Sequence, residues 1–174
     1  MKPVGRTSQD HPLEIAELDL PRAAGLVGIT LCPGKIDPDA ATGGWQRDLG
    51  LDLDRARDWG AALVVTLTEA KELSRLGVPH LGTEVGRRHM GWLHLPIVDA
   101  EAPDALFEAG WPAASRRIHD VLAQGFRVLV HCKGGLGRAG TVAARLAVEH
   151  GMSAEHAIAA VRAVRPGAIE TAVQ

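Results

Sequence analysis

Two apolar runs stand out in the hydrophobic pattern of the chain. Residues 61–67 (AALVVTL) and 126–131 (FRVLVH) are rich in branched hydrophobic side chains and lack a polar alternation. This pattern is typical of strands buried on both faces of a sheet. Shorter strands are predicted over 13–20, 25–31 and 91–97, where proline, glycine or polar turns bound the runs.

Helical patterns alternate with these strands. The predicted helices cover residues 51–59, 69–76, 82–90, 104–124, 139–150 and 153–164. Thr68 is expected to cap the helix over 69–76, whose first turn carries acids that suit the helix dipole. Gly110 and Pro112 predict that the segment 104–124 is interrupted or split. This alternation predicts an α/β fold in which helices flank both faces of a central, mostly parallel sheet.

The remaining segments and the chain length predict a single domain. Residues 1–12 are polar and contain two prolines, so we expect a flexible N-terminal arm before a domain over 13–174. Residues 33–50 are rich in Gly, Asp and Pro and predict a loop. A chain of 174 residues that is 46% hydrophobic builds one core but not two full domains.

Charge and cysteine content narrow the function classes. The 19 Lys plus Arg and 21 Asp plus Glu give a net charge of -2, which excludes a global basic field for nucleic acid or an acidic membrane. Two cysteines, Cys32 and Cys132, are too few for a secreted disulfide scaffold. The sequence has no apolar stretch long enough to span a bilayer and no signal-like start. We therefore expect a soluble, cytoplasmic protein.

The most informative segment is residues 131–141, HCKGGLGRAGT. It lies between a predicted buried strand and a helix, at the carboxyl end of the sheet where α/β folds bind ligands. Its three glycines, at 134, 135 and 137, permit positive φ angles, so the backbone N–H groups can turn inward and form a nest for an anion. The N-terminus of the following helix points to the same place.

Two side chains in this segment carry chemistry. The positive nest favours the thiolate form of Cys132, which makes this residue the candidate nucleophile. Arg138 can fold back across the loop and offer its planar guanidinium to two oxygens of a phosphate. Together they predict attack on a phosphate ester with stabilisation of the developing charge.

The leaving oxygen of such an ester needs a proton, which a carboxylic acid on a separate loop can supply. Asp99 is the preferred candidate because it follows the strand predicted over 91–97, which we expect to neighbour the strand that leads to Cys132. Glu101 and Asp104 are its rivals. Asp104 follows Pro103 at a predicted helix start, so a structural role in the first turn of that helix explains it more simply than a role as the acid.

The H-C-x5-R pattern, with glycines in the loop and an upstream Asp, resembles the cysteine-based protein tyrosine phosphatases in their dual-specificity branch. The resemblance extends further to the kinase-associated phosphatase family, also called the cyclin-dependent kinase inhibitor 3 family, whose loop also reads HCxGGLGR. Residues 72–79, 96–104 and 167–174 also resemble that family, so the likeness covers about 26–174. It implies a phosphatase-type Cys loop between strand and helix.

The resemblance implies a role for each site residue. Cys132 would form a phosphocysteine, Arg138 would bind phosphate, and Asp99 would act as acid in the first step and base in the second. His131 would tune the thiolate and Gln174 would help to place the hydrolytic water. The loop that binds the substrate phosphate would comprise Lys133, Gly134, Gly135, Leu136, Gly137 and Arg138.

The family also implies the partners of the protein. No metal or organic cofactor is expected. The substrates would be phosphorylated proteins, with phosphotyrosine and also phosphoserine or phosphothreonine, or small phosphate esters. Independently of the resemblance, the small net charge and the lack of a long apolar stretch predict neither a nucleic acid nor a membrane as a partner.

Two departures from the family pattern matter. The family usually has Ser or Thr directly after the arginine, where the hydroxyl helps the thiolate to leave, but this chain has Ala139. We therefore predict slow hydrolysis of the phosphoenzyme, since Thr141 lies too far along the chain to substitute. Relatives continue beyond the position of Gln174 through a further helix, so we expect the last helix to be short or missing and Gln174 to be frayed.

Several alternatives stay open or are disfavoured at this point. Ala139 also permits a pseudophosphatase that binds a phosphorylated partner without efficient turnover. A sulfurtransferase or arsenate-reductase-type Cys-loop enzyme is disfavoured by Asp99 and by the loop length. Residues 135–140 match G-x-G-x-x-G, but a dinucleotide fold needs a further strand after the helix.

Residues outside the loop have simpler interpretations. Cys32 is expected to be a small buried hydrophobe at a strand end, with a redox role toward Cys132 as the alternative. His89, His94 and His131 lack the compact spacing of metal ligands. The tryptophans are expected to pack in the core or at its rim, and Trp45, in the Gly-rich loop, is the one to check for contact with a substrate.

Overall fold

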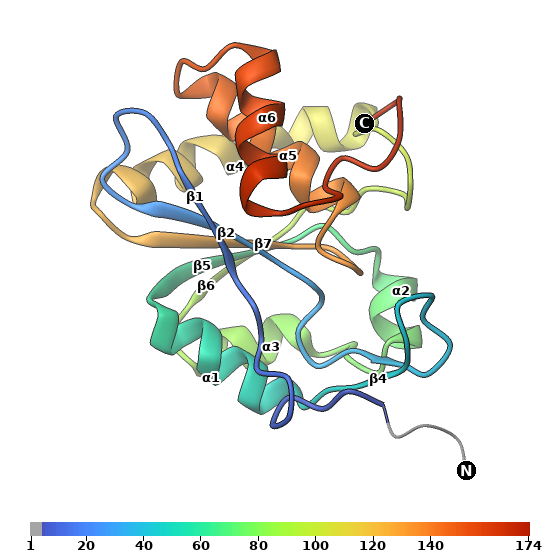
Figure 1. Cartoon of the computed structure of the whole chain (residues 1–174). Coiled ribbons are helices and arrows are strands. Elements are labelled where there is room, and N and C mark those ends of the chain that lie inside the picture. Colours follow the sequence, from blue (N-terminus) through green and yellow to red (C-terminus); the bar gives the residue numbers. More distant parts are fainter. Residues whose placement is uncertain (1–4) are drawn as a thin grey trace.

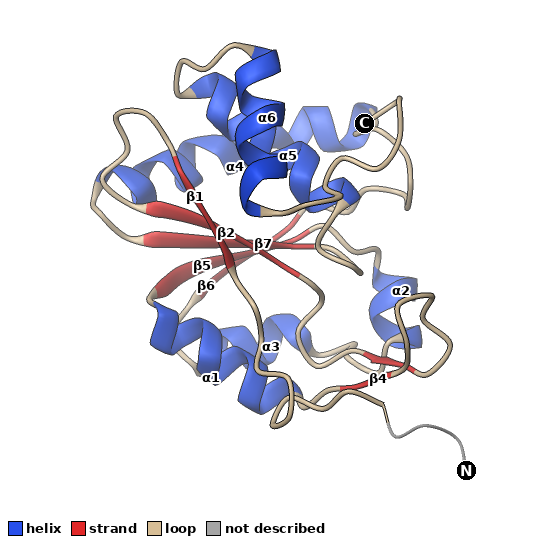
Figure 2. Cartoon of the chain, in the orientation of Figure 1, coloured by secondary structure: helices blue, strands red, loops and turns tan. Residues whose placement is uncertain are grey.

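The computed structural model describes residues 5–174, and its centre is a five-stranded sheet (Figure 1, Figure 2). The strand order is β1-β2-β7-β5-β6. Only β1 runs antiparallel to its neighbour, while the other pairs are parallel. The bounds are β1 Ala16–Asp19, β2 Leu26–Thr30, β5 Ala61–Thr66, β6 Gly91–His94 and β7 Arg127–His131. The predicted α/β fold with a mostly parallel sheet is confirmed.

Helices cover both faces of this sheet, as predicted (Figure 1). One face carries α4 (Ala105–Ala123), α5 (Gly137–Glu149) and α6 (Ala154–Val164). The other carries α1 (Leu49–Trp59) and α3 (Leu81–Arg87), with α2 (Ala70–Arg75) on the same side. A hydrophobic core fills each interface, one around Val130 and Val142 and the other around Val64 and Leu81. Burial on both faces explains why β5 and β7 are continuously apolar.

The helix α4 is continuous, so the predicted interruption at Gly110 and Pro112 is wrong. Pro112 removes a bond to the carbonyl of Glu108, but both residues lie on the exposed face, where water can solvate that carbonyl. The buried face of α4, with Phe107 and Trp111, packs on the sheet without a break. Asp104 is the N-cap and accepts a hydrogen bond from the Phe107 N–H at 2.8 Å, the first-turn role expected for it.

Three local predictions need correction. The cap of α2 is Glu69 rather than Thr68, and its side chain and that of Glu72 form a reciprocal capping box. Residues 33–50 are not all loop, because β3 (Ile36–Asp37) pairs antiparallel with β4 (Trp45–Gln46) and α1 begins at Leu49. β6 ends at His94 and pairs with β5, which separates it from β7, so the strand before Asp99 is not a neighbour of the Cys132 strand.

The N-terminal segment is partly within the described residues. The expected flexible arm over 1–12 includes residues 1–4, which lie outside them. From Arg6 onward the chain is held to the fold, since the Arg6 N–H donates to the Gly44 carbonyl and the Arg6 carbonyl accepts from Gln46. Ser8 is buried and accepts a hydrogen bond from the Asp48 N–H. Arg6 and Ser8 are therefore held against the fold, while residues 9–12 are exposed on its surface.

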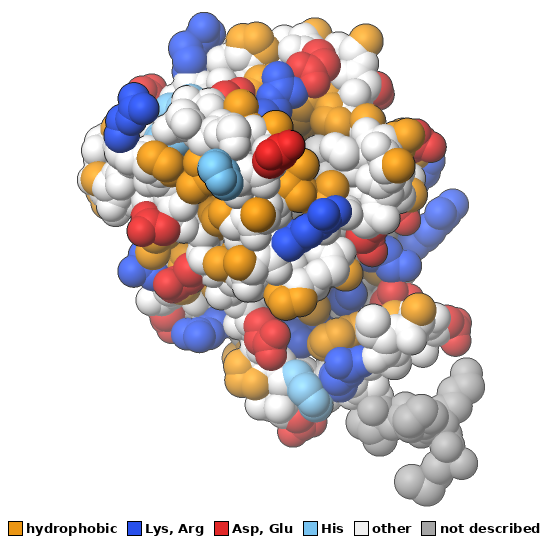
Figure 3. Space-filling view, turned by 45° about the horizontal axis from the view of Figure 1, so that its top comes forward, with side chains coloured by type: hydrophobic (Ala, Val, Ile, Leu, Met, Phe, Trp, Pro, Cys, Tyr) orange, Lys and Arg blue, Asp and Glu red, His pale blue; other side chains and the backbone are white. Residues whose placement is uncertain are grey.

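The surface carries mixed charge. On the face in Figure 3, Lys and Arg side chains alternate with Asp and Glu and with small hydrophobic areas, as the small net charge predicts. Across residues 5–174, the helices fall short of the length and hydrophobicity that crossing a membrane requires.

Candidate active site

Cys132 begins the loop that connects β7 to α5. The side chain is only 3% exposed and lies at the carboxyl end of the central strand of the sheet. Within residues 5–174, the backbone N–H groups of Lys133, Gly134, Gly135 and Leu136 donate to no carbonyl or side-chain oxygen. Consecutive free amides at the start of a helix are suited to bind an anion.

Gly135 fixes the shape of this loop. Of the three loop glycines, Gly135 alone uses the permitted freedom and has a positive φ, at 69°. A Cβ atom at Gly135 would lie 2.4 Å from the carbonyl of Thr30, at the end of β2. The loop thus rests directly on the neighbouring strand, an approach that only glycine permits.

His131 lies beneath the loop in a buried hydrogen-bonded chain. The Trp92 indole donates to Thr66 Oγ1 at 2.8 Å, and Thr66 Oγ1 lies 2.7 Å from His131 Nε2. An indole N–H can only donate, so we assign the Thr66 hydroxyl proton to His131 Nε2. His131 Nδ1–H then faces the Cys132 carbonyl at 3.4 Å.

Burial lowers the pKa of His131 to about 4. The ring is therefore neutral near pH 7. If His131 tunes the thiolate, as the resemblance implies, it does so by fixing the backbone of Cys132 and not by adding a positive charge.

Arg138 is the most heavily bound side chain of the site. It is 1% exposed, and its Nη1 and Nη2 bind the two Glu72 oxygens at 2.7 and 3.0 Å. Nη1 also donates to the Ile97 carbonyl at 3.0 Å, and Nη2 lies 3.1 Å from Asp99 Oδ1. The edge of the guanidinium that remains for a phosphate is therefore the one formed by Nε and Nη2.

Glu72 is a site residue that sequence reasoning missed. An acidic residue in the first turn of a helix is stabilised by the helix dipole. This local role in α2 was a sufficient explanation for Glu72, so no role in the site was expected. Burial alone would raise the pKa of Glu72, but hydrogen bonds from Arg138 and from the Glu69 N–H outweigh burial and hold the pKa below its ordinary value. Glu72 is thus a carboxylate near neutral pH, and it orients Arg138 through two hydrogen bonds.

Asp99 lies on the loop after β6, with its side chain 65% exposed. It lines a cleft of about 320 Å³ together with Glu72 of α2 and Lys133 of the Cys132 loop. The structure therefore brings Asp99 to Arg138 although β6 is two strands away from β7. Its rivals lie elsewhere, because Asp104 is used as a helix cap and Glu101 does not line this cleft.

The C-terminal segment packs against the same loop. Gln174 Oε1 accepts from the N–H groups of Glu170 and Thr171 at 2.9 and 3.2 Å, so the expected fraying of Gln174 is wrong. Within the described residues Gln174 Nε2 is buried without a hydrogen-bond partner. Glu170 Oε2 accepts from the Gly137 N–H at 3.1 Å, and Thr171 donates to the Ala100 carbonyl. This segment therefore links the Cys132 loop to the Asp99 loop.

Both cysteines are free thiols. Cys32 is fully buried after β2, and its N–H donates to the Lys133 carbonyl at 3.2 Å, beside the Cys132 loop. Burial raises the pKa of Cys32, which keeps it a neutral thiol. A redox role toward Cys132 stays a prediction. Over residues 5–174, no three His, Cys, Asp or Glu side chains are grouped to hold a metal ion.

The fold and the site together define a class of protein. A cysteine at the end of a central parallel strand, free loop amides and an arginine at the start of the next helix are the parts of a cysteine-dependent phosphatase of the dual-specificity type. Residues 36–174 match the family described as PTP-SAK, Swiss Army Knife protein, DSP-PTPase phosphatase domain. The chain belongs to this family of phosphatases, and it is an enzyme of the cysteine-based class.

Individual relatives agree with this assignment. The chain is 30% identical to cyclin-dependent kinase inhibitor 3 of Sus scrofa and to that of Rattus norvegicus, over 95% of this chain and 77% of each relative. A crystal structure of kinase-associated phosphatase, with its catalytic-site cysteine replaced by serine, is 28% identical. It has a TM-score of 0.81 and covers 93% of this chain and 89% of its own.

A second solved structure, Tk-PTP in the active form, is 29% identical with a TM-score of 0.67, covering 91% of this chain and 90% of its own. The resemblance drawn from the loop sequence is confirmed. These matches give no support to a sulfurtransferase or an arsenate reductase.

Proposed function

We propose that the chain hydrolyses phosphate monoesters of phosphorylated proteins through a phosphocysteine on Cys132. Phosphotyrosine is the main expected target, with phosphoserine, phosphothreonine and small phosphate esters as further ones. The observation that supports this most is the loop of free amides after Cys132, closed by Arg138. A reducing compartment such as the cytoplasm suits this chemistry, because Cys132 has to remain a free thiol.

In the first step, the Cys132 thiolate attacks phosphorus while the bond from phosphorus to the leaving oxygen breaks. The loop amides and Arg138 stabilise the charge on the three equatorial oxygens. Asp99, as the carboxylic acid, gives its proton to the leaving oxygen. The products of this step are the dephosphorylated alcohol and a thiophosphate ester on Cys132.

In the second step, water attacks phosphorus and the bond from sulfur to phosphorus breaks. Asp99, now a carboxylate, takes a proton from the water. Gln174 Nε2, a free donor beside Gly137, supports the placement of this water. The thiolate of Cys132 and inorganic phosphate are released, which restores the enzyme.

The contacts of Arg138 suggest how binding prepares Asp99. A phosphate on the Nε and Nη2 edge of Arg138 competes with Asp99 for Nη2, while Glu72 keeps its own two bonds. Asp99 is then released toward the leaving oxygen. Glu72 is the positioning residue in this scheme, since it orients Arg138 without touching the substrate.

A second candidate function rests on Ala139. This residue is fully buried and has no hydroxyl to assist the leaving thiolate. The hydroxyl of Thr141 donates to the Gly137 carbonyl at 2.8 Å and is therefore engaged within α5. The missing hydroxyl favours slow hydrolysis of the phosphoenzyme. If this hydrolysis is slow enough, the protein acts as a module that binds a phosphorylated partner without efficient turnover.

The test is a pH profile of p-nitrophenyl phosphate hydrolysis, with a chelator present, for the wild type, Cys132→Ser and Asp99→Asn. We expect turnover that survives the chelator, is abolished in Cys132→Ser and loses the basic limb of its profile in Asp99→Asn. If the wild type is inert but still binds phosphate or vanadate, the phosphatase proposal fails and the binding module is correct. Activity that survives in Cys132→Ser contradicts both.

A further inference from the structure

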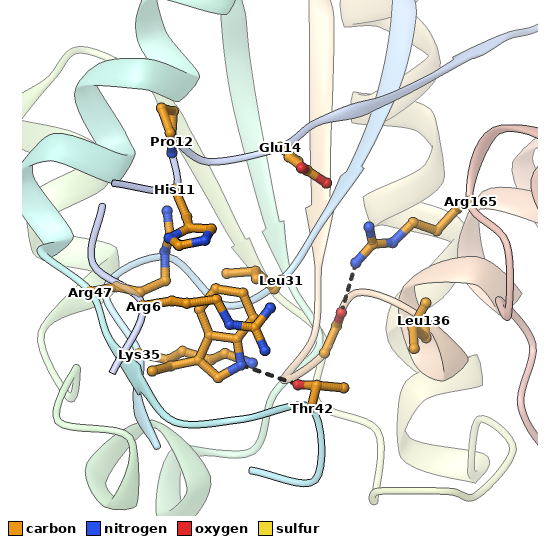
Figure 4. A pocket seen from close by; sticks show the side chains of 12 residues that line it. Arg6, His11, Pro12, Glu14, Leu31, Lys35, Thr42, Arg47, Leu136 and Arg165 are labelled. Carbon is orange, nitrogen blue, oxygen red and sulfur yellow. Dashed lines mark hydrogen bonds between the residues drawn. The ribbon is translucent and has the colours of Figure 1, made fainter. Parts of the chain in front are cut away.

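The carbonyl groups of the Cys132 loop are bound by the surrounding protein. The Lys133 carbonyl accepts a hydrogen bond from Lys35 Nζ at 3.2 Å. The carbonyls of Gly134 and Gly135 accept from Nη2 and Nε of Arg165 at 3.1 and 3.0 Å, and the bond to Gly134 is drawn in Figure 4. Each carbonyl in this part of the loop therefore has a fixed direction.

The amide groups of the same stretch face the opposite way. No peptide bond within residues 5–174 is cis, and in a trans peptide the C=O and the following N–H point to opposite sides of the bond. The bound carbonyls thus turn the N–H groups of Gly134, Gly135 and Leu136 toward the side where the proposed function places the substrate phosphate. Within the described part of the chain, these three N–H groups donate to no protein acceptor.

The next peptide bond, from Leu136 to Gly137, differs in one respect. Its carbonyl is also bound, because it accepts from the Ile169 N–H at 3.3 Å. Its N–H faces the other way and donates to Glu170 Oε2 at 3.1 Å. The C-terminal segment, which ends beside this loop in Figure 1, thus places the Glu170 carboxylate on the amide side of the peptide.

A structural role for this contact is to cap α5. The helix has no acidic residue in its first turn, and its N-cap, Leu136, makes no side-chain hydrogen bond. Glu170 supplies a negative charge from outside the helix, which stabilises the helix dipole. However, a cap needs only a hydrogen-bond acceptor, whereas Glu170 brings a full charge to the end of the helix that is suited to bind the phosphate. The same charge therefore opposes anion binding.

The charge of Glu170 is not neutralised by a neighbouring base. Glu72 and Asp99 both contact Arg138, at 2.7 and 3.1 Å. Over residues 5–174, by contrast, Glu170 has no Lys, Arg or His within ion-pair distance. A phosphoryl group in the loop is therefore repelled by the Glu170 carboxylate with little local compensation.

The side chain of Glu170 can move although its backbone is fixed. The Glu170 N–H donates to Gln174 Oε1 at 2.9 Å. Arg162 donates to the carbonyls of Ala168 and Ile169, both at 3.1 Å, and so ties the segment to α6. Glu170 itself is exposed, so its carboxylate can turn into solvent without a change in the fold.

We propose that the Glu170 carboxylate is an internal competitor for the phosphate-binding loop and sets the affinity of this loop for phosphoryl groups. Glu170 holds the Gly137 N–H until a phosphoryl group takes this N–H and displaces the side chain into solvent. The proposal rests on the phosphatase function and specifies how the site releases its product. Inorganic phosphate is held by the loop alone, so a competing charge favours its release, whereas a substrate keeps the contacts of its protein chain.

The test is the inhibition constant of inorganic phosphate, measured against p-nitrophenyl phosphate, for the wild type, Glu170→Gln and Glu170→Ala. Glu170→Gln keeps an oxygen acceptor for the Gly137 N–H but removes the charge, so phosphate should bind about fivefold more tightly. Glu170→Ala removes the charge and the acceptor and should bind phosphate at least as tightly. In both variants kcat/KM should rise by a similar factor.

The matched control is Glu155→Gln, at an exposed acid in the first turn of α6. It changes the net charge equally at another helix N-terminus and should leave the inhibition constant unchanged. If Glu170 only caps α5, its loss loosens the loop, so an affinity for phosphate that is unchanged or lower in Glu170→Gln would overturn the proposal. An equal gain in Glu155→Gln would also overturn it, because net charge alone would then explain the effect.

The phosphatase function is tested separately by turnover in the wild type. If the wild type does not hydrolyse p-nitrophenyl phosphate, that function fails. The dissociation constants of inorganic phosphate for the same variants, by isothermal titration calorimetry, then decide the role of Glu170. If neither the wild type nor the Glu170 variants bind phosphate, both proposals are wrong.

Discussion

At the level of single residues, Ala139 is the position where one hydroxyl decides the rate of the second chemical step. We expect a rapid-quench experiment with p-nitrophenyl phosphate to show a burst of p-nitrophenol in the wild type, followed by slow turnover. Ala139→Ser should raise the steady-state rate by about tenfold, the effect of one added hydrogen bond to the leaving thiolate, and remove the burst.

The control for this experiment is Ala143→Ser, one turn further along the same buried face of α5. It adds a similar buried hydroxyl away from Cys132 and should leave the burst in place. A wild type without a burst would show that hydrolysis of the phosphoenzyme is not slow, and the interpretation of Ala139 would be wrong.

At the level of elements, the turn from β7 to α5 depends on the close approach of Gly135 to β2. Gly135→Ala places a Cβ within 2.4 Å of the Thr30 carbonyl at a φ of 69°. The loop has to shift, and we expect kcat to fall by about a hundredfold because the amides no longer converge on the phosphate. Gly134→Ala is the matched variant, since a Cβ there has no atom within 4 Å. It should cause a far smaller loss, and equal losses in the two variants would contradict this account.

The same turn shows what the sequence can and cannot predict about the site. The order of strand, glycine-rich turn and helix is local, so the pattern around Cys132 identified it. The bond from Arg138 to Glu72 joins residues 66 positions apart, and no periodicity reports such a pair. Because the helix dipole at the first turn of α2 already explained an acidic residue at position 72, nothing in the sequence indicated that Glu72 pairs with Arg138.

At the level of the whole molecule, hydrophobic patterning predicted the layers but not the order of the strands. Continuous apolar runs identified β5 and β7 as buried on both faces. Patterning reports only whether a face is covered, so it did not reveal that β5 lies between β6 and β7. The continuity of α4 through Pro112 was missed for a related reason, because the packing of its buried face outweighs one lost bond on its exposed face.

The buried chain of Trp92, Thr66 and His131 connects β6, β5 and β7, so its protonation state affects the stability of the whole sheet. The pKa of His131 is about 4 in the folded protein and 6.5 ordinarily. Between these values the unfolded chain binds more protons, and the free energy of unfolding therefore falls as the pH drops from 6.5 to 4. The full loss from this one residue is roughly 3 kcal/mol.

Urea unfolding followed by tryptophan fluorescence at several pH values measures this dependence. His131→Asn should be less stable than the wild type near pH 7, and its stability should decline less steeply between pH 6.5 and 4. His156→Asn, at an exposed position of α6, is the control and should keep the steep decline. If His131→Asn declines as steeply as the wild type, the histidine beneath Cys132 is not held neutral by the fold. Its effect on the thiolate would then have to come from its charge.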